Sequence, residues 1–331
     1  MRACLVGDVT PPIDEGMKKV TYALASALRA HGEVCVLNPL EARTTPFWAT
    51  LRRFRPDVIH YVPGPSMGSF VLLALAKAWT RSVTVMSLTH PDPALPAKFA
   101  CRLFKPDLVL AQSERLENQY RALGCTVRYV PNGVDTSLYR PVWPPDKIEL
   151  RAKYGVPLDA FVVLHVGNTR HVRNLQDLLA LQRDGAQVFI VGSTSVPGDA
   201  EVEAELRQAG CLVLRQYLSH MEEVYGLADC YVFPTVVHNA AIEHPLSVME
   251  AMACNLPVVA RRFGALPRVF EPGGGLYFYD TEAELKDAIR LIRARHTASA
   301  TRAKVKDMDW RTIAAGIAAL YQSLVHASGA N

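Results

Sequence analysis

The stretch that decides the fold runs from Ile242 to Ala260 and reads IEHPLSVMEAMACNLPVVA. Apolar residues recur at helical spacing in its middle, and a proline and a serine stand at the entrance, so a helix should begin near Ser247. Short apolar runs on either side, residues 228–234 and 257–260, are typical of buried strands. The stretch therefore predicts a strand, a polar loop, a helix and a second strand.

Two carboxylates of this unit could serve a ligand: Glu243 in the loop and Glu250, which we place in the first helical turn. A helix that follows a strand presents unpaired backbone N–H groups at the open end of the sheet, where they attract phosphate oxygens. Both carboxylates could then accept hydrogen bonds from sugar or ribose hydroxyls on either side of a diphosphate. Spacing alone favours a plainer interpretation, in which Glu250 complements the helix dipole and Glu243 lies in a solvated loop.

The segment Asp229–Ala260 closely resembles the carboxyl-terminal signature of retaining glycosyltransferases of family 4, which have the α/β GT-B fold and use nucleotide-sugar donors. In that signature two glutamates are separated by seven residues, and the first contacts the donor sugar while the second contacts the ribose. Glu250 matches the second glutamate. Only six residues separate Glu243 from Glu250, and ungapped alignment places Ile242 at the first glutamate. Either the loop is one residue shorter and Glu243 contacts the sugar as a catalytic residue, or the donor sugar is held differently.

A second loop with the features of a phosphate site follows the buried strand that we predict at residues 161–167. Arg170 and Arg173 stand where a diphosphate would need positive charge, although both could be exposed charges at a helix start. In the family an arginine follows the glycine of this loop and a lysine comes six residues after it; here Asn168 and Arg173 occupy those positions. The resemblance implies one set of donor-binding residues, of which Arg173 is also catalytic: Gly16, Gly167, Asn168, Arg170, Arg173, Leu246, Ser247 and Glu250.

The amino-terminal half opens with a predicted strand at residues 2–8, a loop, and a helix at residues 17–30, which is a mononucleotide-type unit. Gly16 has no side chain, so the backbone there could approach a ligand closely. The family glycine at this position approaches the donor phosphates across the interdomain cleft. His90 follows a predicted strand at residues 83–88, on the side of an open sheet where ligands bind. Similar glycosyltransferases have a histidine here that contacts the donor sugar, so we expect His90 to be catalytic, with a turn-capping role as the alternative.

At 331 residues the chain exceeds what one hydrophobic core usually supports. From the GT-B resemblance we predict an acceptor-side Rossmann-like domain at residues 1–145 and a donor domain at residues 146–309. We expect the apolar segment 310–331 to be a terminal helix that crosses back to the first domain. The run Val130–Pro141 also resembles the family segment at the domain junction.

Cysteine usage and apolar patterning bear on localisation. The seven cysteines are scattered singly, which argues against a disulfide framework or a zinc site and favours a reducing compartment. We therefore expect a cytoplasmic protein. The apolar run at residues 3–6 reads as a first strand and not as a signal peptide, and the longest apolar stretch, Phe70–Trp79, is too short to span a bilayer.

Positive charge gathers in the first half of the chain. Residues 1–145 carry 17 Lys and Arg against 11 Asp and Glu, a net charge of +6, while the remainder carries 19 against 21, or −2. This asymmetry suggests an anionic partner for that half, although solvated surface is the commoner explanation. Two segments that mix aromatic and basic residues, 47–55 and 98–105, could lie as peripheral helices on an anionic membrane. We favour the plainer interpretation, in which they are amphipathic helices packed on the sheet.

The predicted function is retaining transfer of a hexose from a UDP- or GDP-sugar to a glycan, lipid-linked or small-molecule acceptor. Preorganised cations and N–H dipoles can stabilise negative charge on the leaving diphosphate without a metal, so we expect no metal, no other cofactor and no nucleic-acid partner. Two alternatives stay open: a GT-B nucleotide-sugar epimerase, and a nucleotide-sugar-binding protein without transfer activity. A dehydrogenase is disfavoured because no Gly-x-Gly-x-x-Gly motif follows a predicted strand.

Overall fold

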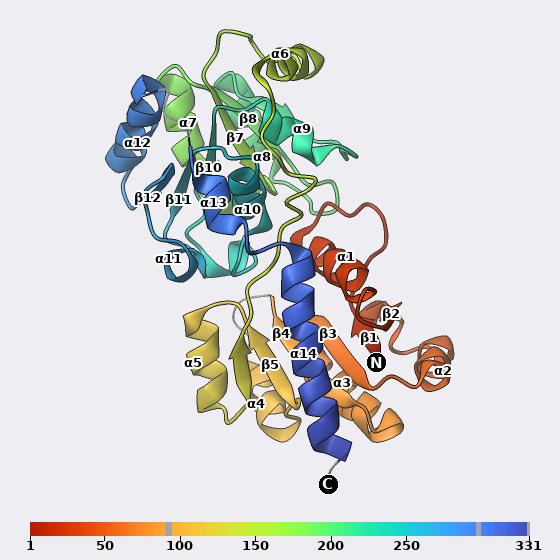
Figure 1. Cartoon of the computed structure of the whole chain (residues 1–331). Helices are drawn as coiled ribbons and strands as arrows, with labels where there is room; N and C mark the ends of the chain where they lie inside the picture. Colours follow the sequence, from red (N-terminus) through yellow and green to blue (C-terminus); the bar gives the residue numbers. More distant parts are fainter. Residues whose placement is uncertain (90–94, 296–298, 330–331) are drawn as a thin grey trace. The chain divides into compact units, whose positions relative to one another are not determined.

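The computed structural model describes residues 1–89, 95–295 and 299–329, and the chain divides into two compact units (Figure 1). The first unit comprises Met1–Gly133, Ala241–His244 and Trp310–Asn331. The second unit comprises Val134–Ala240 and Pro245–Asp309. Each unit has its own parallel sheet and its own hydrophobic core.

The sheet of the first unit has six parallel strands among the described residues, in the order β2-β1-β3-β4-β5-β6. Its strands are β1 (Arg2–Val6), β2 (Glu33–Leu37), β3 (Val58–Gly64), β4 (Val83–Leu88), β5 (Leu108–Ala111) and β6 (Val127–Tyr129). Because β1 lies between β2 and β3, the winding of the sheet reverses at β1. Ligands of such open sheets bind outside the carboxyl ends of the strands near this reversal, so the loop after β1 is at the ligand edge.

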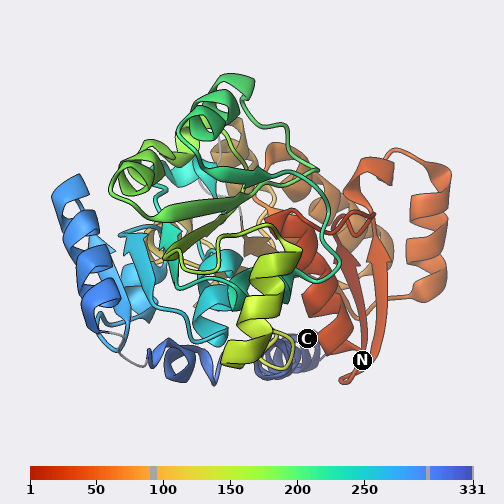
Figure 2. The same cartoon turned by 90° about the horizontal axis from the view of Figure 1, so that it is seen from above.

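Helices flank this sheet (Figure 1, Figure 2). They are α1 (Gly16–Leu28), η1 (Pro39–Glu41), α2 (Thr45–Phe54), α3 (Met67–Thr80), α4 (Leu95–Leu103), α5 (Glu114–Ala122) and α14 (Trp310–Gly329). The terminal helix α14 packs against α1 and β4. The hydroxyl of its buried Tyr321 is hydrogen-bonded to Nδ1 of His60, a buried residue of β3. The last helix of the chain therefore contributes to the core of the first unit.

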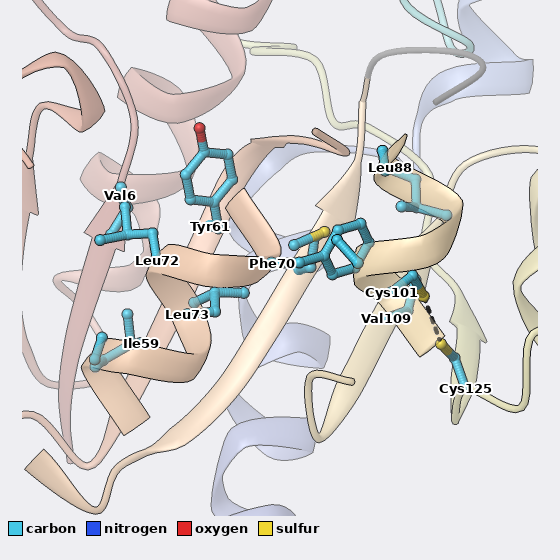
Figure 3. Close-up of a cluster of buried hydrophobic side chains, with 14 of the residues drawn as sticks. Val6, Ile59, Tyr61, Phe70, Leu72, Leu73, Leu88, Cys101, Val109 and Cys125 are labelled. Atoms are coloured by element: carbon cyan, nitrogen blue, oxygen red, sulfur yellow. Dashed lines mark hydrogen bonds between the residues drawn. The ribbon is translucent and has the colours of Figure 1, made fainter. Parts of the chain in front are cut away.

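The core of the first unit consists of apolar side chains from the sheet and from the helices that flank it. Phe70 and Leu73 of α3 lie in the same cluster as Ile59 of β3 (Figure 3). From α2, Phe47 and Leu51 are buried in this cluster. The aromatic and basic segment 47–55 thus turns its apolar side to the sheet, which is the plainer of the two interpretations that its sequence allows.

The second unit also has six parallel strands among the described residues, in the order β12-β11-β10-β7-β8-β9. Its strands are β7 (Val162–Val166), β8 (Gln187–Val191), β9 (Leu212–Leu214), β10 (Cys230–Phe233), β11 (Val258–Arg261) and β12 (Leu276–Tyr279). Its helices are α6 (Pro144–Lys153), η2 (His171–Arg173), α7 (Gln176–Arg183), α8 (Ala200–Gln208), α9 (Met221–Gly226), η3 (His238–Ala240), α10 (Leu246–Ala253), α11 (Leu266–Val269), α12 (Glu282–Arg295) and α13 (Thr301–Val305).

The stretch that decides the fold has the predicted architecture. Strand β10, helix α10 and strand β11 follow one another, and α10 begins at Leu246, one residue before the predicted start. Strands β10 and β11 are neighbours in register, with Tyr231 opposite Val258. The predicted α/β fold with two parallel sheets is confirmed.

The boundary between the units lies at Gly133, whereas the sequence predicts a domain boundary at residue 145. Residues just after Gly133 are tied to the second unit by hydrogen bonds. Thr136 donates its hydroxyl to Asp309 Oδ2 at 2.7 Å, and Arg302 donates to the carbonyls of Thr136 and Tyr139, both at 2.8 Å. These contacts explain why the second unit begins before the proline-rich segment.

Candidate functional site

The loop that follows β7 places the guanidinium of Arg173 beside the carboxyl end of this strand. Gly167 continues the sheet, because its N–H donates to Val191 O at 3.0 Å. A Cβ atom at Gly167 would lie 3.4 Å from Nη1 of Arg173 and 3.2 Å from Nε2 of His165. A glycine here therefore leaves room for the guanidinium of Arg173 beside the carboxyl end of β7. The structure thus groups two of the predicted donor-binding residues, Gly167 and Arg173.

Neighbouring side chains hold the rest of this loop in place. Thr169 is buried and donates its hydroxyl to Glu203 Oε1 at 2.6 Å. The carboxylate of Asp199 accepts from the N–H of His171 at 2.7 Å. Asn168 accepts from the N–H of Arg170 at 3.4 Å, and the Arg170 side chain is exposed. The predicted Asn168 and Arg170 thus lie on a loop whose backbone is anchored from α8 and from the turn before it.

Burial of Glu203 would raise the pKa of its carboxyl group, but its hydrogen bonds act more strongly in the opposite direction. The hydroxyl of Thr169 and the guanidinium of Arg207 donate to it, and the charge of Arg215 adds to the effect, so the pKa is lowered. The anchor of the loop is therefore an ionised carboxylate at neutral pH.

His165 is a buried neighbour of Arg173 that the sequence did not single out. Its Nδ1 lies 3.0 Å from Val232 O, and because a carbonyl only accepts, Nδ1 carries the proton and Nε2 is an acceptor. Burial lowers the pKa of His165 to about 4; the hydrogen bond to Val232 opposes this shift and the charge of Arg173 adds to it. The imidazole is therefore neutral at pH 7 and adds no positive charge beside Arg173.

Helix α10 begins at the carboxyl edge of the same sheet, and its first N–H groups have no side-chain cap. The N-cap residue is Pro245, whose side chain has no acceptor atom. The predicted Leu246 is nearly buried, at 8% exposure, and Ser247 accepts a hydrogen bond from Tyr231 OH at 2.7 Å or donates one to it. Backbone donors at such a helix start are suited to an anion.

Glu250 lies in the second turn of α10 and not in the first, because the helix begins at Leu246. Its carboxylate is buried and accepts from Tyr225 OH at 2.6 Å. Burial and then the charge of Glu250 raise the pKa values of both Tyr225 and Tyr139 well above the ordinary value. The tyrosines thus stay protonated, and Tyr225 holds the carboxylate as a donor. The predicted contact of Glu250 with a ribose stays a prediction.

In the first unit, the loop after β1 ends at a helix whose first N–H groups are already bonded. Oε2 of Glu15 accepts from the N–H groups of Met17 and Lys18, both at 3.1 Å. The predicted Gly16 is the first residue of α1, and a Cβ atom there would lie 3.4 Å from Cδ1 of Ile242. Glu15 is a cap that our sequence analysis missed, although an acidic residue just before a helix is a known N-terminal signal.

The loop residue Glu243 is buried within the first unit. Its Oε1 accepts from Nη2 of Arg115 at 2.7 Å, and its Oε2 has no hydrogen-bond partner among the described residues. The next residue is also tied to this unit, since Asn132 donates its N–H to His244 Nδ1 at 3.0 Å. Arg115 was not predicted as a partner of Glu243, because the two residues are 128 positions apart and nothing local in the sequence links them. Contact of Glu243 with a sugar stays a prediction.

The predicted site residues divide between the units. Gly16 and Glu243 belong to the first unit, and His90 lies outside the described residues, so its role stays a prediction. The second unit holds Gly167, Asn168, Arg170, Arg173, Leu246, Ser247 and Glu250.

The described residues contain no group of three His, Cys, Asp or Glu side chains that could hold a metal ion. The sequence does include an Asp-x-Asp triplet, Asp307-Met308-Asp309. In the structure Asp309 Oδ2 accepts from the hydroxyl of Thr136 at 2.7 Å, so it acts as a structural acceptor. The expectation of a metal-free site stays a prediction.

Two family models match the chain. Residues 160–294 match the model described as Glycosyl transferases group 1, and residues 38–138 match the model described as Glycosyltransferase Family 4. The first of these matches contains the loop after β7 and helix α10. The second contains most of the first unit, including Arg115.

Curated relatives are similar over most of this chain. The sulfoquinovosyl transferase of Arabidopsis thaliana is 25% identical over 304 residues, which are 82% of this chain and 58% of that protein. The alpha-maltose-1-phosphate synthase of Mycolicibacterium smegmatis is 29% identical over 224 residues, which are 60% of this chain and 57% of that protein. The chain thus spans somewhat more than half the length of these relatives.

Solved structures have the same fold at low sequence identity. Sucrose-phosphate synthase from Thermosynechococcus elongatus has a TM-score of 0.81 at 19% identity, over 99% of this chain and 100% of that one. The Anabaena protein HepE, solved in complex with UDP-glucose, has a TM-score of 0.73 at 21% identity, over 98% of this chain and 100% of that one. These likenesses confirm the predicted GT-B fold.

Proposed function

The chain belongs to glycosyltransferase family 4, the glycosyl transferases group 1, and from this premise we propose that it transfers a hexose from a nucleotide-diphosphate sugar. The donor is a UDP- or GDP-sugar, the acceptor is a glycan, a lipid-linked molecule or a small molecule, and the configuration at the anomeric carbon is retained. The donor diphosphate binds at the carboxyl edge of the second sheet.

The observation that carries this proposal is the charge arrangement of the loop after β7. Arg173 lies against the strand end at Gly167, and Arg170 is exposed on the same loop. Guanidinium groups match phosphate oxygens in geometry and charge. The uncapped N–H groups at the start of α10 are a second source of positive potential on the same unit. Both features stabilise negative charge on a leaving nucleoside diphosphate.

The remaining predicted residues have supporting roles in this proposal. Glu250, held by Tyr225, accepts a hydrogen bond from the ribose of the donor. Ser247, held by Tyr231, positions the first turn of α10. Glu243, His90 and Gly16 act from the first unit, and their contacts with the donor rest on the family resemblance.

Relatives favour a transferase over the two alternatives. The Arabidopsis relative is named a transferase, and HepE was solved with UDP-glucose. A nucleotide-sugar epimerase or a binding protein would need the same diphosphate site, so the loop after β7 supports all three. Only turnover with an acceptor separates them.

Cofactor and location are part of the same proposal. The cations and N–H groups of the second unit take the role that a metal has in other transferases, so turnover proceeds without one. All seven cysteines are free thiols, which supports a reducing compartment such as the cytoplasm. We further propose peripheral contact of the first unit with a membrane, where a lipid-linked acceptor would be available.

Isothermal titration with UDP and then GDP, in buffer with EDTA, tests the proposal. A mass-spectrometric assay of the matching donor sugar follows release of the sugar to water. We expect one nucleotide to bind and its sugar to be released slowly, because water replaces the missing acceptor. Absence of binding to either nucleotide would contradict the diphosphate site. Binding with no sugar release, even with glycan and lipid-linked acceptors added, would favour the binding protein.

A further inference from the structure

Helix α3 turns a row of apolar side chains away from the core. Met67, Val71, Leu75 and Trp79 recur every four residues and are exposed by 55%, 37%, 55% and 57%. The opposite side of the helix supplies Phe70, Leu73 and Ala76 to the core. A surface helix normally has charged or polar residues on its outer face. In α3 the single charged residue is Lys77, which pairs with Asp107.

Helix α4, a neighbour of α3, also exposes apolar side chains. It packs against α3, and its residues Ala100 and Cys101 are buried. Phe99 and Leu103, with Phe104 just after the helix, are exposed by 64%, 60% and 41%. We call the exposed apolar residues of both helices the α3–α4 face: Met67, Val71, Leu75, Trp79, Phe99, Leu103 and Phe104. Exposed apolar side chains in such number on two packed helices are typical of an interaction site.

A basic cavity adjoins the α3–α4 face at Trp79. It has a volume of about 530 Å³, and its lining includes Arg52, Arg55, Arg81 and Trp79. Cζ of Arg52 lies 5.8 Å from the centroid of the Trp79 ring. None of the three arginines has an ion pair with a described residue. The acidic member of the lining is Asp57, whose carboxylate accepts from the N–H of Arg2 at 2.6 Å.

Position and charge separate this surface from the donor site. The cavity lies at residues that precede β3 and β4, including Pro56 and Ser82, which is the amino-terminal edge of the sheet. Ligands of the sheet bind at the opposite edge. From Pro65 to Lys105 the sequence has five Lys and Arg and one acidic residue, Asp92. The surface therefore combines exposed apolar groups with an excess of positive charge.

We infer that the α3–α4 face docks on a bilayer that contains anionic phospholipid, with headgroup phosphates bound by the arginines of the cavity. The apolar side chains enter the boundary between headgroups and acyl chains, as they do in interfacial helices. Arginines at the rim bind the anionic headgroups. This inference deepens the peripheral membrane contact proposed above and rests on it.

Charge complementarity selects the membrane over a second copy of the chain. In a symmetric dimer the same patch lies on both subunits, so the basic set Arg52, Arg81, Arg102 and Lys105 of one subunit would approach the same basic set of the other. Like charges placed opposite one another disfavour such an interface. The described residues contain no helix long and apolar enough to cross a membrane, so the contact we infer is interfacial.

Flotation of the full chain with vesicles tests the inference. Vesicles of phosphatidylcholine alone are compared with vesicles that also contain phosphatidylglycerol. We expect the chain to float with the mixed vesicles only, and the bound fraction to fall as salt is raised. Leu75→Glu should lower the bound fraction at least about tenfold, because a charge then enters the acyl boundary. The double substitution Arg52→Glu, Arg81→Glu should lower it similarly.

Leu158→Glu is the matched control, because Leu158 lies in the second unit and is exposed by 56%, as Leu75 is by 55%. It should bind the mixed vesicles as the unchanged chain does. Met67→Glu is a second variant on the face, in case Leu75→Glu unfolds. Trp79 gives an independent signal: its emission should shift to the blue on mixed vesicles, and Trp79→Phe should remove that shift.

Three outcomes would overturn the inference. The first is no flotation of the unchanged chain with mixed vesicles. The second is flotation of folded Leu75→Glu and Met67→Glu equal to that of the unchanged chain. The third is a dimer in solution that Leu75→Glu converts to a monomer, with no vesicle binding. UDP and GDP titrations on the same samples show separately whether the donor site is intact, so failure of the membrane surface and failure of the transferase proposal are distinguishable.

Discussion

The helices that follow the first strand of each sheet, α1 and α7, begin differently in the two units. In the first unit Glu15 places its own carboxylate on the first N–H groups of α1. In the second unit α7 follows the N-cap residue Leu175, which has no acceptor, and the loop before it carries Arg170 and Arg173. The same strand–loop–helix topology thus has a capping carboxylate on the first N–H groups in one unit. In the other it has no side-chain cap, and the carboxylate of the first helical turn, Asp177, pairs with Arg261. The difference indicates that an external diphosphate belongs to the second unit.

Other helices show the same contrast. In the first unit Ser66 caps α3 and Ser113 caps α5 through side-chain hydrogen bonds to backbone N–H groups. In the second unit the residue before α10 is Pro245, whose side chain cannot cap the helix. Capping side chains stabilise a helix but occupy the donors that an anion would use. Side chains thus occupy the first N–H groups of α1, α3 and α5 in the first unit, whereas α7 and α10 of the second unit have no side-chain cap.

The largest effect should come from Arg173. Arg173→Ala removes the cation that lies over Gly167, so kcat/KM for donor turnover should fall about 100-fold, equal to about 3 kcal/mol of transition-state stabilisation. Steady-state kinetics measures this. Arg183→Ala removes an exposed arginine from the other end of α7 and should leave kcat/KM unchanged. Unaltered turnover in Arg173→Ala would refute the assignment of the second unit.

Buried histidines in both units, with His60 and His244 in the first and His165 in the second, should make stability fall in acid. The pKa of His60 in the first unit is about 3 and that of His165 in the second about 4, both lowered by burial. The pKa of each histidine in the folded protein lies below its value of about 6.5 in the unfolded chain. The stability that each neutral imidazole contributes is therefore fully present above about pH 6.5 and is lost as the pH falls. Each should lower the free energy of unfolding by about 1.4 kcal/mol per pH unit between about pH 6 and pH 4.

Urea unfolding at a series of pH values measures this slope. His165→Gln should make the slope shallower by one proton if the variant is folded. An equal slope in this variant and the unchanged chain would show that His165 is protonated in the folded state, against its burial beside Arg173.

Glu250 should have a smaller effect that appears in binding. Glu250→Gln keeps the shape of the side chain but removes its charge, so the Kd for the nucleotide should rise about tenfold, or about 1.4 kcal/mol. Titration calorimetry measures the change. Tyr225→Phe removes the donor that holds the carboxylate and should raise Kd less than Glu250→Gln does. The reverse order would mean that Tyr225 and not Glu250 contacts the ligand.

The smallest effect concerns Glu15 and affects stability alone. Glu15→Ala removes the cap of α1 and should lower the free energy of unfolding by about 1 kcal/mol. Nucleotide affinity should change little, because the cations that bind the diphosphate lie in the second unit and Glu15 itself caps α1. Urea unfolding and titration calorimetry on one sample measure both quantities. Tighter nucleotide binding in Glu15→Ala would instead show that the carboxylate of Glu15 competes with the diphosphate at α1.

Much of the fold follows from local sequence. The strand–helix–strand around α10 was predictable because prolines and short apolar runs mark its limits, and the structure starts α10 within one residue of the prediction. Glu250 was predicted in the first turn of α10 but lies in the second, because the helix begins one residue earlier than predicted. Glu15 was predictable as a cap, but we interpreted the segment before α1 as a ligand loop.

Contacts between distant segments were not predictable from one sequence. Arg115 and Glu243 are 128 positions apart, and Tyr225 and Glu250 are 25 apart, with no pattern that pairs them. The outer face of α3 is a further case. An apolar stretch shows that a helix is apolar, but only the packing of Phe70 and Leu73 shows that Val71 and Leu75 lie outside.

Hydrogen–deuterium exchange with and without saturating UDP or GDP tests the contrast between the units most directly, because protection reports which backbone N–H groups a ligand covers or stabilises. With the nucleotide that binds, the account predicts slower exchange in peptides that span residues 167–174 and 246–250. Exchange at residues 16–18, where Glu15 already holds the N–H groups, should slow less than exchange at residues 167–174. Protection at residues 16–18 with none at residues 167–174 would contradict the account.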